Sequence, residues 1–475
     1  MESLTVREIV RAVHGTLLCG DPDTEISYIS IDSRDIQENT LFTPIIGERV
    51  DAHKFLKQVF ENGAKAAFTS RGAIVDETKP HILVEDTQEA LGDLAIYYRS
   101  KFPVPVIGIT GSVGKTSTKE MIAAALATKF RVLKTAGNQN SNIGVPLTLY
   151  RLGPEHEIAV VEMGISDFGE MDALVRFAAP ETAVVTNIGV AHIGILKTQE
   201  NIMKEKLKIA KDFKPGQNLY LNGNDPMLYE AAGDYPENAH LFGHQTAESG
   251  DASGNFEYYA KNIHIKDGKQ HFTFVWPQGE TSVEIRQIGL HNVNNAVVAM
   301  AIAMAYGIDP EMAKEGLAAY AGVPMRQQIL HLNNGIKVID DTYNASPDSI
   351  KSGLQVLELL DNPGKKIAVL ADVLELGDMS WQCHYDTGCF VSGCGIDEVV
   401  AVGEEMKALV QAVNEKNPSI ITHSFMNNDD AAAYLKTIVG PGDALLVKGS
   451  RGMHQEEIVE LLRDWFAPGT DYVCE

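Results

Sequence analysis

The chain has 475 residues, and at roughly 150 residues per domain this length predicts about three domains. Forty lysine and arginine residues against 64 aspartate and glutamate residues give a formal net charge of −24, which argues against a nucleic-acid-binding protein, since such proteins need a basic face. The longest nearly apolar run, residues 296–308, is too short to cross a bilayer, and the N-terminus carries no apolar signal segment, so we expect a cytoplasmic protein without membrane insertion. We also expect a monomer.

The N-terminal part is predicted to be the smaller of three α/β domains, spanning residues 1–102. Apolar runs at 64–70 and 81–87 are typical of strands, and residues 87–102 are expected to form a helix. A linker with two prolines follows this helix.

The central domain is predicted over residues 103–325. Short apolar runs at 106–110, 158–164 and 183–189 alternate with helical patterns, which is typical of a mostly parallel sheet. An alternating segment at 263–274 surrounds Asp267-Gly268, the preferred sequence of a two-residue hairpin turn, and a helix is expected over 292–306.

The C-terminal domain is predicted over residues 326–475. The segments IKVIDD, KIAVLAD, EVVAVG and ALLVKGS are four candidate parallel strands, each followed by a helix, which indicates a doubly wound, Rossmann-like domain. Cys383, Cys389 and Cys394 lie close in sequence but lack paired C-x-x-C spacing, so we interpret them as structural thiols, with zinc binding as the alternative.

The sharpest motif is GITGSVGKTS, residues 108–117, where a predicted strand meets a predicted helix. A phosphate-binding loop needs glycines so that backbone N–H groups can approach phosphate oxygens, a lysine for the β- and γ-phosphates, and a hydroxyl for Mg²⁺. Gly111, Gly114, Lys115 and Thr116 meet these needs in a variant T-G-x-x-G-K-T loop. The alternative is an unrelated glycine-rich turn, but the strand–helix context favours nucleotide binding.

Polar residues at the ends of the next two predicted strands suggest a metal site. Glu162 and Asn187 end these strands, and His192 follows in a short loop. Because ligands bind at the carboxyl ends of strands in open α/β sheets, Glu162 and His192 could hold a second divalent ion near the phosphates, together with a threonine of the loop. Taken singly, Glu162 would instead be a helix cap and His192 an ordinary loop histidine.

Lys206 differs from its lysine neighbours in the predicted helix ENIMKEKLKIAK. Lys204, Lys208 and Lys211 share one stripe, predicted to be solvated, whereas the helical neighbours of Lys206 are apolar: Ile202, Met203, Ile209 and Ala210. A desolvated lysine has a lowered pKa and more neutral amine, which can react with CO₂ to form a carbamate. A lysine that extends along the apolar face to water is an equally good interpretation.

Together these motifs resemble the Mur ligase family, in particular the type that adds D-alanyl-D-alanine to UDP-N-acetylmuramoyl-tripeptide. The resemblance runs over nearly the whole chain. It includes the segments IDSRDIQENTLFTPIIGERVDAHKF, TAGNQNSNIGVPLTL, EMG, TNIGVAH, GLHNVNNA, DDTYNASPDS and VKGSR. Ser141 stands where the family usually has a second asparagine.

The resemblance implies an ATP-dependent amide ligase of peptidoglycan precursor synthesis, working through an acyl phosphate with ATP, two Mg²⁺ ions and a carbamylated lysine. It implies catalytic roles for Lys115, Asn187, His192, Lys206 and Arg326. It implies that ATP is bound by Gly111, Ser112, Val113, Gly114, Lys115, Thr116, Ser117, Asn292, Asn295, Arg326 and Asp341. It implies that metal is bound by Thr116, Glu162, His192 and Lys206. It implies that the UDP-linked substrate and dipeptide are bound by Ser33, Arg34, Asp51, His53, Asn138, Asn140, Asn142, Ser450 and Arg451.

Two alternatives remain at this point. One is another ligase of the same architecture, of the folylpolyglutamate or cyanophycin type, which would lack the N-terminal uridine-nucleotide segment. The other is an ATP-gated binding protein, whose phosphate release would not depend on an amine acceptor.

Overall fold

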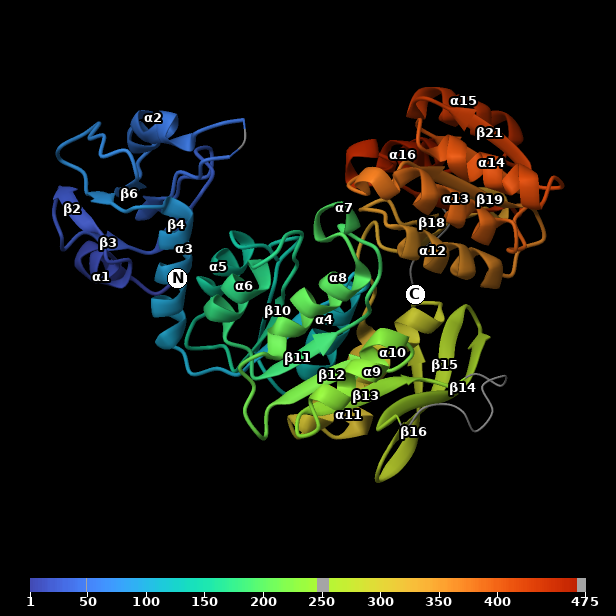
Figure 1. The fold of residues 1–475 in the computed structure, drawn as a ribbon, viewed down its shortest axis with the longest axis horizontal. Helices are drawn as coiled ribbons and strands as arrows, with labels where there is room; N and C mark the ends of the chain where they lie inside the picture. The colour runs from blue at the N-terminus through green and yellow to red at the C-terminus, as the bar shows by residue number, and fades with distance from the viewer. Residues whose placement is uncertain (48, 246–255, 468–475) are drawn as a thin grey trace. The chain divides into compact units, whose positions relative to one another are not determined.

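The computed structural model describes residues 1–47, 49–245 and 256–467. It contains three α/β domains, so the predicted fold class is confirmed (Figure 1). Residue contacts group the chain into two compact units, one of residues 1–110, 129–183 and 208–217, the other of residues 111–128, 184–207 and 218–475. The N-terminal domain falls in the first unit and the C-terminal domain in the second, while the central domain contributes to both.

The N-terminal domain has a five-stranded sheet in the order β2-β7-β6-β5-β4, in which β4 to β7 run parallel and β2 is antiparallel. Its core is apolar and includes Phe42, Leu56 and Val59. The strands are β1 (Leu4–Thr5), β2 (Thr16–Cys19), β3 (Glu25–Ile26), β4 (Tyr28–Ser30), β5 (Thr40–Phe42), β6 (Ala66–Thr69) and β7 (His81–Leu83). The helices are α1 (Val6–Ala12), α2 (Leu56–Glu61) and α3 (Thr87–Ser100).

The central domain has a nine-stranded sheet in the order β16-β15-β14-β13-β12-β11-β8-β10-β9. Its strands are β8 (Val106–Thr110), β9 (Val132–Lys134), β10 (Ile158–Glu162), β11 (Thr182–Val185), β12 (Asn218–Asn222), β13 (Ala239–His244), β14 (Tyr258–Lys266), β15 (Lys269–Trp276) and β16 (Gly279–Ile285). Its helices are α4 (Lys115–Leu126), α5 (Gly144–Leu149), α6 (Glu170–Ala178), α7 (Ile193–Leu196), α8 (Gln199–Leu207), α9 (Pro226–Ala231), α10 (Leu290–Ala305) and α11 (Pro310–Ala319).

The predicted hairpin is confirmed in this sheet. Strands β14 and β15 pair antiparallel, and the turn residues Asp267 and Gly268 have φ angles of +52° and +72°. Positive φ at both central residues is what the favoured two-residue hairpin turn requires, and it is why this dipeptide signals the turn.

The C-terminal domain has a six-stranded sheet in the order β17-β18-β22-β19-β20-β21, with only β17 antiparallel. Its strands are β17 (Gln328–His331), β18 (Lys337–Asp340), β19 (Lys366–Ala371), β20 (Glu398–Val402), β21 (Ile421–Phe425) and β22 (Ala444–Lys448). Its helices are α12 (Pro347–Leu359), α13 (Ser380–Val391), α14 (Met406–Lys416), α15 (Asn428–Ile438) and α16 (Glu456–Trp465).

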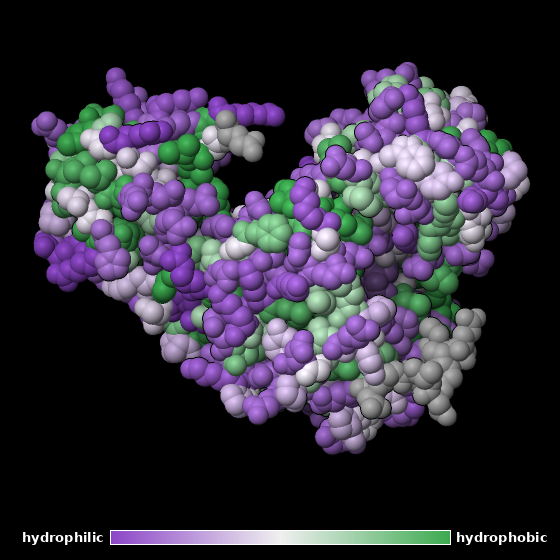
Figure 2. Space-filling model, viewed as in Figure 1, coloured by the Kyte–Doolittle hydropathy of each residue, from purple (hydrophilic) through white to green (hydrophobic). Residues whose placement is uncertain are grey.

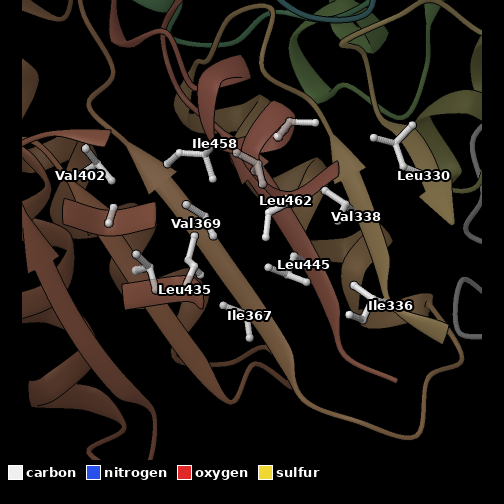
Figure 3. Close-up of a cluster of buried hydrophobic side chains, with 14 of the residues drawn as sticks. Leu330, Ile336, Val338, Ile367, Val369, Val402, Leu435, Leu445, Ile458 and Leu462 are labelled. Carbon is white, nitrogen blue, oxygen red and sulfur yellow. The ribbon is translucent and has the colours of Figure 1, made fainter. Parts of the chain in front are cut away.

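Apolar strand residues cover both faces of this C-terminal sheet. Figure 3 shows Val338, Ile367, Val369 and Leu445 packed against side chains of α15 and α16, such as Leu462. The alternate strand residues are also buried, and helix α12 contacts β19 and β22. A sheet with both faces buried is the doubly wound arrangement that the continuous apolar runs predicted.

The helix containing Lys206 is shorter than predicted. Helix α8 ends at Leu207, and Lys208–Ala210 form a 3₁₀ turn, so Ile209 and Ala210 do not continue the α-helix. The predicted solvated stripe holds for Lys204 and Lys211, which are exposed, whereas Lys208 is half-buried. Lys208 and Lys211 both form ion pairs with Asp172.

The surface is mainly hydrophilic on the face in Figure 2, with scattered apolar residues. In the described part of the chain, no helix has the length and apolarity that a membrane crossing requires. Cys19, Cys383, Cys389 and Cys394 are free thiols. Among all residues that the structure describes, no group of three or more His, Cys, Asp or Glu side chains could hold a metal. Zinc binding by the cysteine cluster therefore receives no support.

Candidate functional site

The phosphate loop lies between β8 and α4, in the strand–loop–helix context that the sequence predicted. Gly111 has a φ of +145°, and a Cβ atom there would lie 1.9 Å from the hydroxyl oxygen of Thr186. Gly114 precedes the first residue of α4 with a φ of +85°. Both positions therefore require glycine, since a side chain would be strained at either and would collide with Thr186 at the first.

Asn187 is bonded directly to this loop. Its backbone carbonyl accepts the Ser112 N–H at 3.1 Å, and its side-chain Oδ1 accepts the Val113 N–H at 2.8 Å. The neighbouring Thr186 hydroxyl donates to the Val113 carbonyl at 2.5 Å. The segment after β11 thus holds the phosphate loop in one conformation.

Two lysines converge on one carbonyl of the loop. The Lys115 Nζ donates to the Gly111 oxygen at 2.8 Å, and the Lys206 Nζ donates to the same oxygen at 3.1 Å. Lys206 is only 2% exposed; burial, with the nearby Lys115 ammonium adding to it, lowers its pKa well below the ordinary value. The Lys115 ammonium at this carbonyl suits an anionic ligand, while Lys206 is favoured as a neutral amine.

His192 takes up a left-handed backbone conformation, with a φ of +62°, at the start of α7. Burial lowers the pKa of its imidazole; Glu375 opposes this shift, whereas Lys115 and Lys206 add to it. Its buried Nδ1 lies 3.1 Å from a Glu375 carboxylate oxygen but has no hydrogen-bond partner, because the two groups are not aligned for one. A neutral imidazole with a buried, unbonded nitrogen fits a metal ligand.

Glu162 is the last residue of β10 and pairs with Ile109 of β8. Thr110, the last residue of β8, follows Ile109 and leads into the phosphate loop. It is 1% exposed, and its Oε1 accepts the Asn140 side-chain amide at 2.8 Å. Asn140 also accepts the Gly164 N–H through its backbone. Asn138 is exposed, and Asn142 is half-buried with an Oδ1 that has no hydrogen-bond partner.

The two predicted ATP-binding asparagines of α10, Asn292 and Asn295, are both buried, and one of them is bonded to the helix after the phosphate loop. The Thr118 hydroxyl donates to Asn295 Oδ1 at 2.9 Å, and Asn292 donates to the Ile288 carbonyl at 3.0 Å. Thr116 is buried and Ser117 half-buried at the start of α4. The predicted ATP-binding residues of α4 and α10 thus lie along one packed helix pair.

In the C-terminal domain, Asp341 forms a buried ion pair with a residue that sequence reasoning missed. The Lys448 Nζ lies 2.6 Å from Asp341 Oδ2 and also donates to the Asn344 carbonyl at 3.0 Å. Lys448 is 1% exposed, and burial lowers its pKa while Asp341 opposes that effect. Its position in the VKGSR motif was the available signal, but nothing in the sequence pairs it with Asp341.

Arg326 stacks on Tyr343, with its guanidinium carbon 4.1 Å from the ring centroid. Arg451 lies near the same ring at 5.9 Å and pairs with Glu456. The Ser450 hydroxyl accepts the Leu374 N–H at 2.9 Å.

The residues predicted to bind the uridine nucleotide lie in the loop after β4 (Ser33 and Arg34) and at the start of the 3₁₀ helix Ala52–Phe55 (Asp51 and His53). Asp51 accepts from His53 through both its backbone N–H and its ring nitrogen, and the backbone bond is the main reason that the pKa of Asp51 falls to about 2. His53 in turn accepts the Ser70 N–H at 3.0 Å. The exposed Arg34 side chain pairs with Asp32, and Ser33 is half-buried.

A cavity of about 870 Å³ is lined by residues of α6, the end of α3 and the segment 209–217. None of the predicted site residues lines it. Since chemistry and not cavity size identifies a site here, we place the candidate site at the phosphate loop.

An α/β protein with a lysine-bearing phosphate loop between a strand and a helix is a nucleotide-binding protein. The chain belongs to the Mur ligase family. Residues 25–99 match the Mur ligase family catalytic domain, residues 109–303 the Mur ligase middle domain, and residues 325–451 the Mur ligase glutamate ligase domain.

Similar proteins span nearly the whole chain. The UDP-N-acetylmuramoyl-tripeptide–D-alanyl-D-alanine ligase of Bacillus subtilis (strain 168) is 37% identical over 462 residues, covering 96% of this chain and 97% of the relative. A crystal structure of MurF from Acinetobacter baumannii is 32% identical, with a TM-score of 0.89 and coverage of 98% and 99%. MurF ligase from Thermotoga maritima in complex with ADP is 28% identical, with a TM-score of 0.80 and coverage of 92% and 97%.

Proposed function

We propose that this chain joins D-alanyl-D-alanine to UDP-N-acetylmuramoyl-tripeptide, using ATP, in the cytoplasmic synthesis of peptidoglycan precursors. The observation that carries the proposal is the end-to-end similarity to ligases of this name, at 37% identity over 96% of the chain for the Bacillus subtilis relative. The phosphate loop and the ADP bound to the Thermotoga maritima relative support the nucleotide.

The reaction proceeds in two steps. The terminal carboxylate of the tripeptide attacks the γ-phosphate of ATP, which gives an acyl phosphate and ADP. The amine of D-alanyl-D-alanine then attacks the acyl carbon, and phosphate leaves as the amide forms. No side-chain nucleophile is needed, so the protein contributes position and charge.

Each proposed nucleotide residue contributes to position or charge. Lys115 supplies a fixed positive charge for the β- and γ-phosphates, while the N–H groups of the loop and of the first turn of α4 approach their oxygens. Asn187 holds the loop in shape through the Ser112 and Val113 N–H groups. Arg326, Asp341, Asn292 and Asn295 complete the nucleotide site.

The donor set suits Mg²⁺. Magnesium is usually held by one or two protein carboxylates together with substrate phosphates, not by a complete protein cage. The hydroxyl of Thr116, the carboxylate of Glu162 and the unbonded nitrogen of His192 would hold two ions, together with a carbamate on Lys206. When bound, Mg²⁺ neutralises charge on the phosphoryl oxygens.

Lys206 is suited to carbamate formation, because burial and Lys115 favour its neutral amine. The amine nitrogen forms a bond to the carbon of CO₂, one C–O π pair moves onto oxygen, and the proton leaving the nitrogen passes to water. The resulting anion would attract the Lys115 ammonium, which donates to the same Gly111 carbonyl.

The remaining proposed residues recognise the other substrates. Ser33, Arg34, Asp51 and His53 bind the uridine nucleotide, and Asn138, Asn140 and Asn142 contact the rest of the UDP-linked substrate. Ser450 and Arg451 contact the substrate from the C-terminal domain.

The test measures phosphate release with UDP-N-acetylmuramoyl-tripeptide and ATP, using D-Ala-D-Ala, L-Ala, D-Glu and L-Lys as acceptors. We expect turnover with the dipeptide and little with single amino acids. Equal turnover with a single amino acid would favour another ligase of this architecture. Phosphate release that does not depend on an acceptor would favour an ATP-gated binding protein.

A further inference from the structure

Three successive backbone N–H groups in the segment after Asn187 are each bound by a side chain from a different part of the chain. The Gly189 N–H donates to the Ser112 hydroxyl at 2.9 Å, and the Val190 N–H donates to Asp348 at 3.1 Å. The first of the three, the Ile188 N–H, donates to Asp225 Oδ2 at 2.7 Å.

Asp225 performs two tasks at once. Its Oδ1 caps helix α9 by accepting the Met227 and Leu228 N–H groups at 3.0 and 3.2 Å. Its second oxygen, Oδ2, is thereby left to accept the Ile188 N–H. Ile188 is buried, so loss of this acceptor would leave a buried N–H group unsatisfied.

A second hydrogen bond joins the end of β12, close in sequence to Asp225, to the segment that follows β11. The Asn222 side-chain amide, at the end of β12, donates to the Thr186 carbonyl at 2.8 Å. Asp225 and Asn222 therefore hold residues 186–188, and these residues hold Ser112 and Val113 of the phosphate loop.

We infer that Asp225 is a positioning residue for nucleotide binding, acting through the segment 186–190 on the phosphate loop. This inference rests on the proposed function, since it takes the phosphate loop as the nucleotide site. Without the anchor, the loop populates other conformations in the free protein. Binding must then reorder it, which weakens apparent affinity in proportion to the population lost.

The test uses Asp225→Asn and Asp225→Ser. Asparagine and serine are both good N-caps, so either can keep α9 capped. Each offers only one acceptor oxygen in place of two, so the cap and the Ile188 N–H cannot both be satisfied. We expect the Kd for ADP, measured by titration calorimetry without the other substrates, to rise about tenfold in both variants.

Asp309→Asn is the matched control. Asp309 also caps a helix, α11, that begins with proline, but it is exposed and its carboxylate caps only that helix. We expect this variant to bind ADP like the unaltered protein. Asparagine caps a helix as well as aspartate does, so the Asp309→Asn variant shows the effect on ADP binding of an aspartate-to-asparagine change at a helix cap alone.

Steady-state kinetics separate positioning from simple loss of folded protein. In the Asp225 variants we expect the KM for ATP to rise, with the KM values for the UDP-linked substrate and the dipeptide within about twofold of normal. A smaller folded fraction would lower kcat but move no KM value.

Folded Asp225 variants that bind ADP as tightly as the unaltered protein would overturn the inference, whether or not their thermal midpoints fall. Failure of the unaltered protein to bind ADP would instead contradict the proposed function. The two failures are therefore distinct.

Discussion

Lys115 and Lys206 show how the side-chain nitrogens of two lysines can meet at one carbonyl oxygen. Both Nζ atoms donate to the Gly111 carbonyl, and Lys206 is only 2% exposed. Two like charges in a desolvated site oppose each other, so the arrangement favours either an anionic ligand or neutralisation of one amine. The proposed phosphates and carbamate satisfy both conditions.

The Lys115→Ala variant tests the first lysine. We expect kcat to fall about 100- to 1,000-fold, because a preorganised charge is lost where charge develops in the transition state. The measurement is phosphate release, with circular dichroism as a check on folding. The control is Lys129→Ala, since Lys129 is exposed just past the end of α4. Normal rates in folded Lys115→Ala would contradict the nucleotide assignment.

The Lys206→Ala variant tests the second. We expect activity to fall about tenfold or more, which is the usual effect of removing a metal ligand or a group that supports one. Millimolar acetate should restore part of the activity by supplying the missing carboxylate. The matched control is Lys204→Ala on the same helix, where the side chain is exposed. Full activity in Lys206→Ala, or equal loss in Lys204→Ala, would argue against the carbamate.

At the scale of elements, the phosphate loop depends on what lies beside it. Gly111 faces the hydroxyl of Thr186 so closely that a methyl group cannot fit, and Asn295 of α10 fixes Thr118 of α4. The loop's conformation is therefore set by the segment after β11 and by α10 as much as by its own glycines.

Gly111→Ala should damage this loop locally. We expect unfolding stability to fall by about 1–3 kcal/mol, the cost of a strained backbone position, and ADP binding to be lost. Thermal unfolding and ADP titration measure the two effects. Gly233→Ala is the control, because a Cβ atom there meets nothing within 4 Å. Tight ADP binding by Gly111→Ala would show that the loop tolerates a different shape.

The first helix provides a test of pH dependence. Glu8 accepts the Thr5 N–H in a capping box and pairs with Lys101, and these bonds, the backbone bond foremost, lower its pKa to about 2 from 4.5. Ionised Glu8 thus stabilises the folded state at neutral pH. This contribution is fully present above pH 4.5 and is lost as the pH falls toward 2.

We therefore expect Glu8→Gln to lower the urea midpoint at pH 7, and the difference from the unaltered protein to shrink as the pH falls below about 4.5. Glu61→Gln, at an exposed position of α2, serves as the control. A difference that stays constant between pH 7 and 3 would indicate that Glu8 acts through packing and not through its charge.

For the whole molecule, a net charge of −24 has to be reconciled with anionic substrates. Local charge decides this, because interactions between exposed charges are screened beyond about 10 Å at 0.1 M salt. At the phosphate loop, the Lys115 ammonium bonded to the Gly111 carbonyl supplies local positive charge for an anionic ligand.

The assignment of ATP contacts to both Lys115 and Asp341 predicts closure of the C-terminal domain over the central one when nucleotide binds. Small-angle scattering with and without a non-hydrolysable ATP analogue and the UDP-linked substrate should show a smaller radius of gyration for the bound state. Identical profiles would contradict closure while leaving the chemistry in place.

The sequence by itself determined the features that depend on neighbours along the chain. The strand–loop–helix around Lys115, the hairpin at Asp267-Gly268 and the doubly wound C-terminal domain were all predicted, because glycine placement, turn chemistry and apolar periodicity are local properties. Family membership was also predicted and is confirmed by the matched domains and relatives. Short or polar strands such as β5 and β21 were missed, since they carry little periodic signal.

Only the tertiary structure decided which distant residues share an atom or a charge. The pairs Lys448–Asp341 and Asp225–Ile188 join residues 107 and 37 positions apart, and no pattern within either segment announces the partner. The end of α8 at Leu207 and the pairing of Lys208 and Lys211 with Asp172 were likewise set by packing and charge across the fold. Local propensity is a weak prior that tertiary contacts override, so these contacts had to be seen in three dimensions.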